Sequence, residues 1–239
     1  MPATQQLEAV TIATMWRWES LEAGENDVSA VGRRAILSVL QFPGATNGRP
    51  RRSTPALPAF RPFQLATLSD AIPSGSAWLF EMKFDGYRAQ AALRGSEVRV
   101  YTRNGHDWTS QFSAIVPSLK ALTDGSALID GEICALDKGG HTDFSMLKVG
   151  IGAGAPLKFF AFDLLELNGQ DLRTLRLIER KAALKTLLGK RSRDDVVQFS
   201  DHVVGKGKAM FDEMCAGGHE GILAKRADGT ISVTAPETG

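Results

Sequence analysis

The stretch WLFEMKFDGYR, residues 78–88, combines a period-two pattern with a turn signal. Apolar side chains alternate along it with Glu81, Lys83 and Asp85, which predicts a β-strand with one face in a hydrophobic core. The Asp-Gly pair predicts a turn just beyond the strand. Partial burial of a lysine here favours its neutral, nucleophilic form. The alternative interpretation is an ordinary half-buried strand with a solvated polar face.

The composition is ordinary for a globular protein. The chain has 239 residues, of which 43% are hydrophobic and 23% charged, and its net charge is +1. Any grip on nucleic acid therefore requires a local basic patch. Cys134 and Cys215 lack metal-ligand spacing, so we expect inert thiols in a reduced cytosolic protein. No run of eighteen apolar residues and no secretory signal pattern is present, so we expect no membrane span and a cytoplasmic location.

The chain divides into four predicted parts. In residues 1–42, apolar side chains at 7, 10, 15, 18 and 21 suggest a weak amphipathic helix in a segment of uncertain order. Residues 43–62 hold five of the ten prolines and several arginines, which indicates an extended, solvated linker. Residues 63–228 form the predicted domain. Residues 229–239 form an atypical C-terminal tail.

The pattern within the domain mixes strands and helices. Period-two alternation or short apolar runs predict strands over 97–103, 127–136, 157–167 and 220–225 in addition to the lysine strand. Helical spacing predicts helices over 112–122, 174–190 and 206–216. Turn signals between neighbouring strands favour hairpins. The predicted fold class is therefore α+β, with antiparallel sheets and packed helices.

Two carboxylates interrupt one apolar strand. Asp130 and Glu132 share one face of the sequence ALIDGEICAL. Burying a carboxylate is costly unless it is paired or binds a ligand or metal. We therefore predict that this face is the wall of a pocket, although a solvated edge strand is the alternative.

The spacing K-x-D-G-x-R, formed by Lys83, Asp85, Gly86 and Arg88, resembles the nucleotidyl-lysine motif of covalent nucleotidyltransferases. That superfamily includes ATP-dependent DNA ligases, RNA ligases and mRNA capping enzymes. Further segments that resemble ligase motifs follow in the expected order: YTRNG (101–105), DGEI (130–133), FAFDLL (160–165) and EGILAKR (220–226). Together with SDH (200–202), they are most similar to bacterial end-joining ligases. The resemblance implies a nucleotidyltransferase (ATP-grasp-like) adenylation domain.

The resemblance also implies the chemistry. Lys83 is expected to attack the α-phosphorus of ATP, form a lysyl-AMP and release pyrophosphate, after which AMP passes to a DNA 5′-phosphate during repair. The implied binding roles are adenine for Glu81, adenine stacking for Phe162, ribose and phosphate for Arg88 and Arg103, ribose and Mg²⁺ for Glu132, and Mg²⁺ for Glu220. Strict alternation points Lys225 away from Glu220, so Lys225 is not included among the predicted site residues.

The match weakens after residue 228. The family continues into a W-x-K-x-K-like strand and an OB-fold domain, and neither is present in ADGTISVTAPETG, which follows Arg226. We therefore expect weak adenylylation and sealing by this chain, unless an OB-fold domain or end-joining partner acts in trans. Two alternatives remain: an RNA ligase or capping-type enzyme, and an inactive nucleotide- or DNA-binding module.

Overall fold

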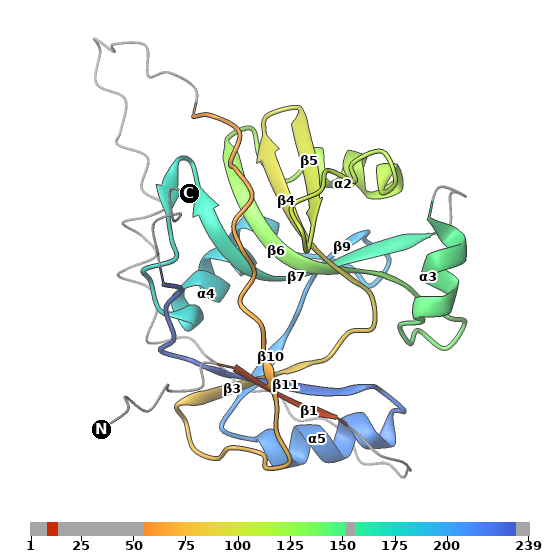
Figure 1. Cartoon of the computed structure of the whole chain (residues 1–239), viewed down its shortest axis with the longest axis vertical. Helices are drawn as coiled ribbons and strands as arrows, with labels where there is room; N and C mark the ends of the chain where they lie inside the picture. The colour runs from red at the N-terminus through yellow and green to blue at the C-terminus, as the bar shows by residue number, and fades with distance from the viewer. Residues whose placement is uncertain (1–8, 14–54, 152–155, 233–239) are drawn as a thin grey trace.

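Two β-sheets face each other with helices packed on their outer sides (Figure 1). The computed structural model describes residues 9–13, 55–151 and 156–232, and only the backbone of residues 9–13. The smaller sheet has the order β10-β3-β11-β1-β2. Its strands are β1 (Ala9–Ala13), β2 (Thr67–Leu68), β3 (Trp78–Met82), β10 (His202–Val204) and β11 (Gly221–Arg226).

The larger sheet has the order β5-β4-β6-β7-β8, with β9 paired to β7. Its strands are β4 (Tyr87–Arg94), β5 (Glu97–Thr102), β6 (Ser126–Ala135), β7 (Leu157–Leu167), β8 (Gln170–Asp171) and β9 (Val197–Phe199). The helices are η1 (Ser113–Ile115), α2 (Val116–Lys120), α3 (Phe144–Gly150), α4 (Leu177–Leu188) and α5 (Gly207–Ala216). Within the described chain, only the β1–β2 and β7–β9 pairs are parallel. The predicted α+β class with antiparallel sheets is therefore confirmed.

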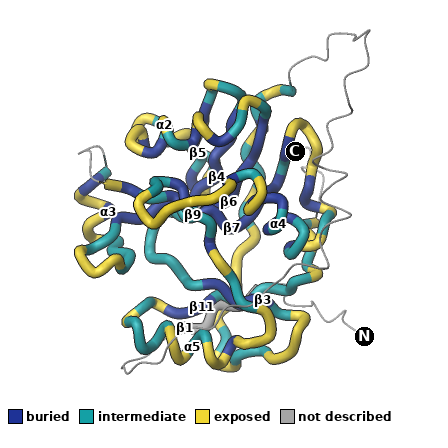
Figure 2. Tube along the Cα trace, turned by 180° about the vertical axis from the view of Figure 1, so that it is seen from behind, coloured by how far each residue is buried: buried dark blue, intermediate teal, exposed yellow. Residues whose placement is uncertain are grey.

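The main hydrophobic core lies on the larger sheet. Ile115, Ile129, Phe159 and Leu184 are fully buried there, which joins η1, β6, β7 and α4. Figure 2 shows how the buried positions follow the central strands while turns stay exposed. Nearly every residue of β6 is buried, including Asp130, and Glu132 is the one residue of this strand that is partly exposed.

The smaller sheet has its own core under α5. Phe80 and Ile222 are fully buried and pack against Met210, Phe211 and further apolar side chains. Because β3 is covered on this side by α5, its other side faces the larger sheet. The lysine strand thus has one face in a core, as its alternation predicts, and Glu81 on the opposite face is also buried.

The chain crosses from the smaller to the larger sheet just after Lys83. A Cβ on Gly86 would lie 2.3 Å from the carbonyl oxygen of Ile133, so only glycine permits this close approach. The predicted Asp-Gly turn therefore lets the backbone at Gly86 pass close to the backbone of β6. This close approach fixes where β3 ends relative to β6 and hence where Lys83 lies.

Two predictions about the N-terminal half are wrong. Residues 9–13 form strand β1, which pairs with β11, where the sequence suggested a helix; the rest of that suggested helix lies outside the described residues. The linker was predicted over residues 43–62, of which 43–54 lie outside the described residues; residues 55–62 pack on the larger sheet and are not solvated. Pro58 is buried, and the backbone of Arg61 exchanges hydrogen bonds of 2.9 and 2.8 Å with the Gln90 side chain. Pairing with distant strands overrides the local pattern in both segments.

Several smaller elements also differ from prediction. The helix expected over 112–122 is a short 3-10 turn and the five-residue α2, because Pro117 favours only the first helical turn. Helix α3 and strands β8, β9 and β10 were not predicted. No helix among the described residues is long and apolar enough to cross a membrane.

Candidate active site

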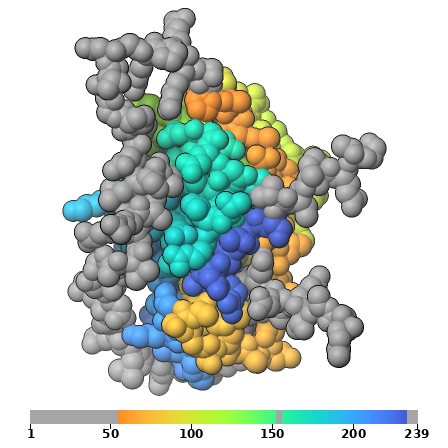
Figure 3. Space-filling view, turned by 90° about the vertical axis from the view of Figure 1, so that its left-hand side faces the viewer, coloured from red at the N-terminus to blue at the C-terminus, as the bar shows by residue number. Residues whose placement is uncertain are grey.

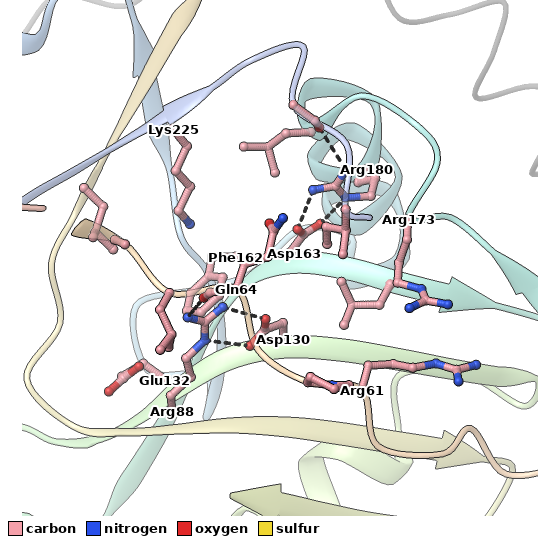
Figure 4. Close-up of a pocket in the computed structure, with 18 of the residues that line it drawn as sticks. Arg61, Gln64, Arg88, Asp130, Glu132, Phe162, Asp163, Arg173, Arg180 and Lys225 are labelled. Atoms are coloured by element: carbon pink, nitrogen blue, oxygen red, sulfur yellow. Dashed lines mark hydrogen bonds and ion pairs between the residues drawn. The ribbon is translucent and has the colours of Figure 1, made fainter. Parts of the chain in front are cut away.

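A cavity of about 280 Å³ lies between the two sheets. Both sheets contribute side chains to it, and the segment 61–66, helix α4 and residues 229–231 close its sides (Figure 4). This volume is near the lower end of the range for small-ligand sites, roughly 300 to 1,000 Å³. The cavity is therefore large enough for a nucleotide's base and part of its phosphate chain.

Basic side chains dominate the wall. Eight basic residues and three acidic residues line the cavity: Arg61, Lys83, Arg88, Arg103, Arg173, Arg180, Lys225 and Arg226, against Asp130, Glu132 and Asp163. Seven of the eight basic residues form ion pairs, five of them with carboxylates outside the lining, so their charge is largely balanced within the protein. A ligand with several phosphates could bind here by replacing some of these carboxylates as the partner of a guanidinium or ammonium group.

Lys83 lies at the junction of the two sheets. Its backbone N–H donates to the carbonyl oxygen of Gly221 (2.9 Å), and its side chain forms an ion pair with Glu220. The Lys83 side chain is 27% exposed. The antiparallel register of β3 and β11 thus brings together two predicted site residues that are 137 positions apart in the chain.

Arg88 and Asp130 form a paired group on the floor of the cavity. The guanidinium donates to the Asp130 carboxylate at 2.9 and 3.3 Å and to the carbonyl oxygen of Gln64 at 2.6 Å. Its centre lies 5.3 Å from the ring centroid of Phe162. Burial raises the pKa of Asp130, and the ion pair with Arg88 opposes that shift. The prediction that Asp130 and Glu132 line a pocket is confirmed.

Glu132 is the other carboxylate on this floor. Burial raises its pKa to about 8; Arg88 and Lys83 oppose the shift, while Asp130 and Glu220 add to it. A nearby cation would strongly stabilise the ionised form of a carboxyl group whose pKa is raised by burial. Glu132 is thus chemically suited to bind a divalent ion or a ribose hydroxyl.

Phe162 provides an aromatic surface beside these groups. The ring is 6% exposed, and the Lys225 ammonium lies 4.4 Å from its centroid. Lys225 also donates to the Glu81 carboxylate at 2.7 Å. Figure 4 shows Lys225 reaching down from β11 towards Phe162.

Glu81 lies behind the cavity wall. Its side chain is 1% exposed and is absent from the residues that line the cavity, because Lys225 lies between. Burial raises the pKa of Glu81, but the ammonium groups of Lys181 and Lys225 outweigh burial and hold it below its ordinary value. Glu81 is therefore a buried, ionised acceptor that a ligand reaches only when Lys225 moves.

The structure gathers most of the predicted site residues. Five of them line the cavity: Lys83, Arg88, Arg103, Glu132 and Phe162. Glu220 reaches the site through its ion pair with Lys83, and Glu81 lies behind Lys225. Lys225, which the predicted site left out, also lines the cavity, because Glu220 precedes β11 and Gly221, with a φ of 150°, breaks the strict alternation between them.

Sequence reasoning also missed a buried ion pair. Arg180 of α4 donates to both oxygens of Asp163 at 2.8 Å and to the carbonyl oxygen of Gly229 at 3.2 Å. Asp163 lies within the segment FAFDLL (160–165), but no role was predicted for it. The helical pattern of 174–190 identified α4 but not its buried charged residues, because a charged side chain on a helix is usually solvated.

No group of three potential metal ligands occurs among the described histidine, cysteine, aspartate and glutamate side chains. Mg²⁺ is commonly held by one or two carboxylates together with water and substrate phosphates. The carboxylates of Glu132 and Glu220, which influence each other electrostatically, fit such a site.

Comparison with known proteins gives a consistent result. The family described as "ATP dependent DNA ligase domain" matches residues 64–233. The multifunctional non-homologous end joining protein LigD of Pseudomonas aeruginosa is 35% identical over 184 residues, which cover 76% of this chain and 22% of that protein. The Mycobacterium tuberculosis LigD is 33% identical over 153 residues, which cover 64% and 20%. The chain therefore spans about a fifth of the length of these relatives.

Solved structures give the same answer for the fold. A structure described as mycobacterial DNA ligase D complexed with ATP and MES has a TM-score of 0.60 and 31% identity, and the match covers 66% of this chain and 51% of that one. The ligase domain from M. tuberculosis LigD has the same score and identity, with 66% and 52% covered. Because the family match includes most of this chain and the motif residues meet in one cavity, the chain belongs to the ATP-dependent DNA ligase domain family.

Proposed function

We propose that this chain is the adenylation domain of an ATP-dependent DNA ligase of the end-joining type and forms a lysyl-AMP on Lys83. The observation that supports this most directly is the position of Lys83. Its side chain lines a cavity with eight basic and three acidic residues, which also holds the Phe162 ring. A nucleophile, a surface for a base and charges for phosphates are therefore within one small volume.

The reaction follows from these groups. The Lys83 amine attacks the α-phosphorus of ATP, a P–N bond forms, and the bond to the β-phosphate oxygen breaks with release of pyrophosphate. An ammonium has no lone pair, so Lys83 must first leave Glu220 and lose its proton to solvent. Arg88 and Arg103 neutralise charge on the nucleotide as the bond order changes.

Mg²⁺, when bound, would neutralise charge that develops on the phosphates. Glu132 and Glu220 would hold it, and their approach to the cation would free Lys83 from its ion pair. Glu81 would accept from the adenine edge and Phe162 would stack on the ring.

The second half of the reaction uses DNA. AMP passes from Lys83 to the 5′-phosphate at a nick or break, and the 3′-hydroxyl then displaces AMP. We propose that these transfer steps occur in the bacterial cytoplasm during end joining and that an OB-fold domain or an end-joining partner contributes to DNA binding.

Intact-mass spectrometry after incubation with ATP and Mg²⁺ tests the proposal. We expect a mass gain of one adenylyl group in the wild type and in Lys120→Ala, whose lysine is exposed on α2, but none in Lys83→Ala. Loss of the adduct on addition of nicked DNA would establish transfer. Transfer to nicked RNA instead, or labelling by GTP, would indicate an RNA ligase or capping-type enzyme; no adduct in the wild type would contradict the proposal.

A further inference from the structure

A fully buried lysine on α4 lies behind the end of the cavity that Phe162 and Lys225 line, where the proposed function places the base. Lys181 is 0% exposed, and its ammonium lies 2.8 Å from the Glu81 carboxylate. It also donates to the carbonyl oxygens of Ser200 (2.9 Å) and Phe162 (3.3 Å). Removing an ammonium group from water is costly. The burial of Lys181 with three partners around its amine therefore needs an explanation.

The partners of Lys181 come from three different elements. Glu81 belongs to β3 of the smaller sheet, Phe162 belongs to β7 of the larger sheet, and Ser200 follows β9. Ser200 begins the SDH segment, which the proposed reaction leaves without a role. Lys181 thus fixes the distance between the Glu81 carboxylate and the backbone beneath the Phe162 ring.

Lys181 and Lys225 differ in how firmly they hold Glu81. Lys225 is 16% exposed, lines the cavity and lies over the Phe162 ring, where a base would stack. A base that stacks there must displace Lys225. Lys181 has no access to the cavity and therefore stays with Glu81 when Lys225 leaves.

Glu81 keeps unused capacity to accept a hydrogen bond. Its Oε1 contacts Lys181 as an ion pair without hydrogen-bond geometry, and no other group in the described part of the chain bonds to it. The side-chain oxygen of Ser200 and Nδ1 of His202 are also buried without partners in the described chain. His202 is paired with Glu81 across β10 and β3. Three of the four such atoms therefore cluster behind the end of the cavity where the proposed function places the base.

We propose that Lys181 is a positioning residue that keeps Glu81 ionised and aimed at the base, and thereby selects a purine with an amino group at position 6 over one with a carbonyl group there. An ionised carboxylate only accepts hydrogen bonds. At position 6 adenine offers an amino donor, whereas hypoxanthine has a carbonyl oxygen that the carboxylate repels and offers only its N1–H as a donor at this edge. This inference rests on the proposed function, because it assumes that the base of ATP stacks on Phe162.

The test is the ratio of affinities for ATP and inosine triphosphate, measured by calorimetry on the full chain. We expect the wild type to prefer ATP and Lys181→Met to reduce that preference about tenfold or more, since an uncompensated Glu81 takes up a proton and can donate to hypoxanthine. Lys185→Met is the matched control. Lys185 lies one turn further along α4, is 68% exposed and also lies near the Phe199 ring, so its removal should leave the ratio unchanged.

A double variant keeps the test informative if Lys181→Met folds poorly. Glu81→Gln combined with Lys181→Met removes both buried charges and should show the same ratio as Glu81→Gln alone, because Lys181 acts through Glu81. Equal weakening of both nucleotides in Lys181→Met would overturn the inference and leave the proposed function intact. Failure of the wild type to bind ATP would overturn both.

Discussion

Lys83 and Glu220 form an ion pair where β3 and β11 meet, 137 positions apart in the chain. The pair lies at the mouth of the cavity, with the Lys83 side chain 27% and the Glu220 side chain 41% exposed. In the proposed reaction, the lysine that would accept the adenylyl group is held by a carboxylate that also belongs to the proposed metal-binding pair. A cation held by Glu220 would therefore release Lys83 from this ion pair.

The first prediction concerns this pair. In Glu220→Gln the cation loses a charged ligand, so adduct formation at limiting Mg²⁺ should slow about 10- to 100-fold, and higher Mg²⁺ should restore part of the rate. The rate is measured by intact mass against time across a Mg²⁺ series. Glu213→Gln, an exposed acid on α5, is the control. If the rate of adduct formation by Glu220→Gln is lowered equally at every Mg²⁺ concentration, Glu220 only orients Lys83.

The second prediction concerns the Arg88–Asp130 pair. Arg88→Ala should lower the free energy of unfolding by about 2–3 kcal/mol, because it leaves the buried Asp130 carboxylate without a partner. Adding Asp130→Asn should recover part of that loss. Urea unfolding of the variants gives the comparison, with Arg94→Ala as the control. Arg94 lies on the same strand as Arg88 and forms an exposed ion pair with Glu97 of β5, so its substitution should change the free energy of unfolding by less than about 0.5 kcal/mol. If the losses in the free energy of unfolding caused by the two substitutions simply add in the double variant, the pairing is refuted.

The third prediction is a pH dependence of stability. Burial lowers the pKa of His202 from 6.5 to about 4, and Lys181 adds to the shift. The unfolded chain therefore binds a proton below pH 6.5 that the folded protein does not accept until about pH 4, so stability falls as the pH falls through this window. Between pH 7.5 and 5 the His202 contribution is on the order of 2 kcal/mol.

Urea unfolding of His202→Gln at both pH values isolates this contribution, because the other titrating groups are unchanged. The variant should lose less stability than the wild type between the two conditions. His106→Gln, an exposed histidine, should behave like the wild type. Identical pH dependence in all three proteins would show that His202 is accessible to protons in the folded state.

The fourth prediction concerns the end of the domain. Ala227 links the start of β3 to α4, since its N–H donates to the carbonyl oxygen of Ala77 and its carbonyl oxygen accepts from the N–H of Ile178. In Figure 3 this blue segment lies between the teal region and the gold region of the chain. Gly229 then accepts from the N–H of Leu177, and Ile231 packs against Ala92, Leu128 and Leu165.

Ile231→Ala should therefore cost about 1–2 kcal/mol in the free energy of unfolding, as expected for a half-buried aliphatic side chain. Ser232→Ala, at the exposed next position, should have little effect. Chemical denaturation of the two variants provides the measurement. If Ile231→Ala is neutral, the domain ends near residue 228, as the sequence alone suggested.

Much of this protein could be predicted from the sequence because its motifs are local. The alternation around Lys83, the carboxylates within an apolar strand and the long strand over 157–167 each depend on neighbours a few residues away. The same locality explains why the motif spacing identified the family. The errors at residues 9–13 and 55–62 arose where strand pairing or packing with distant residues decided the local structure.

Only the tertiary structure decided which charges meet. Alternation assigns Glu81 and Lys83 to one face, but it cannot state that Lys225, 144 positions away, covers Glu81, or that Lys181 supports it from α4. Register shifts between Leu128 and Ile129 and between Asp130 and Gly131 alter how β6 faces β7, and no period in the sequence encodes them. The face of a strand on which a side chain lies follows from the sequence of that strand. Its partner and its burial depend on other strands and helices, which pack against it only when the chain folds.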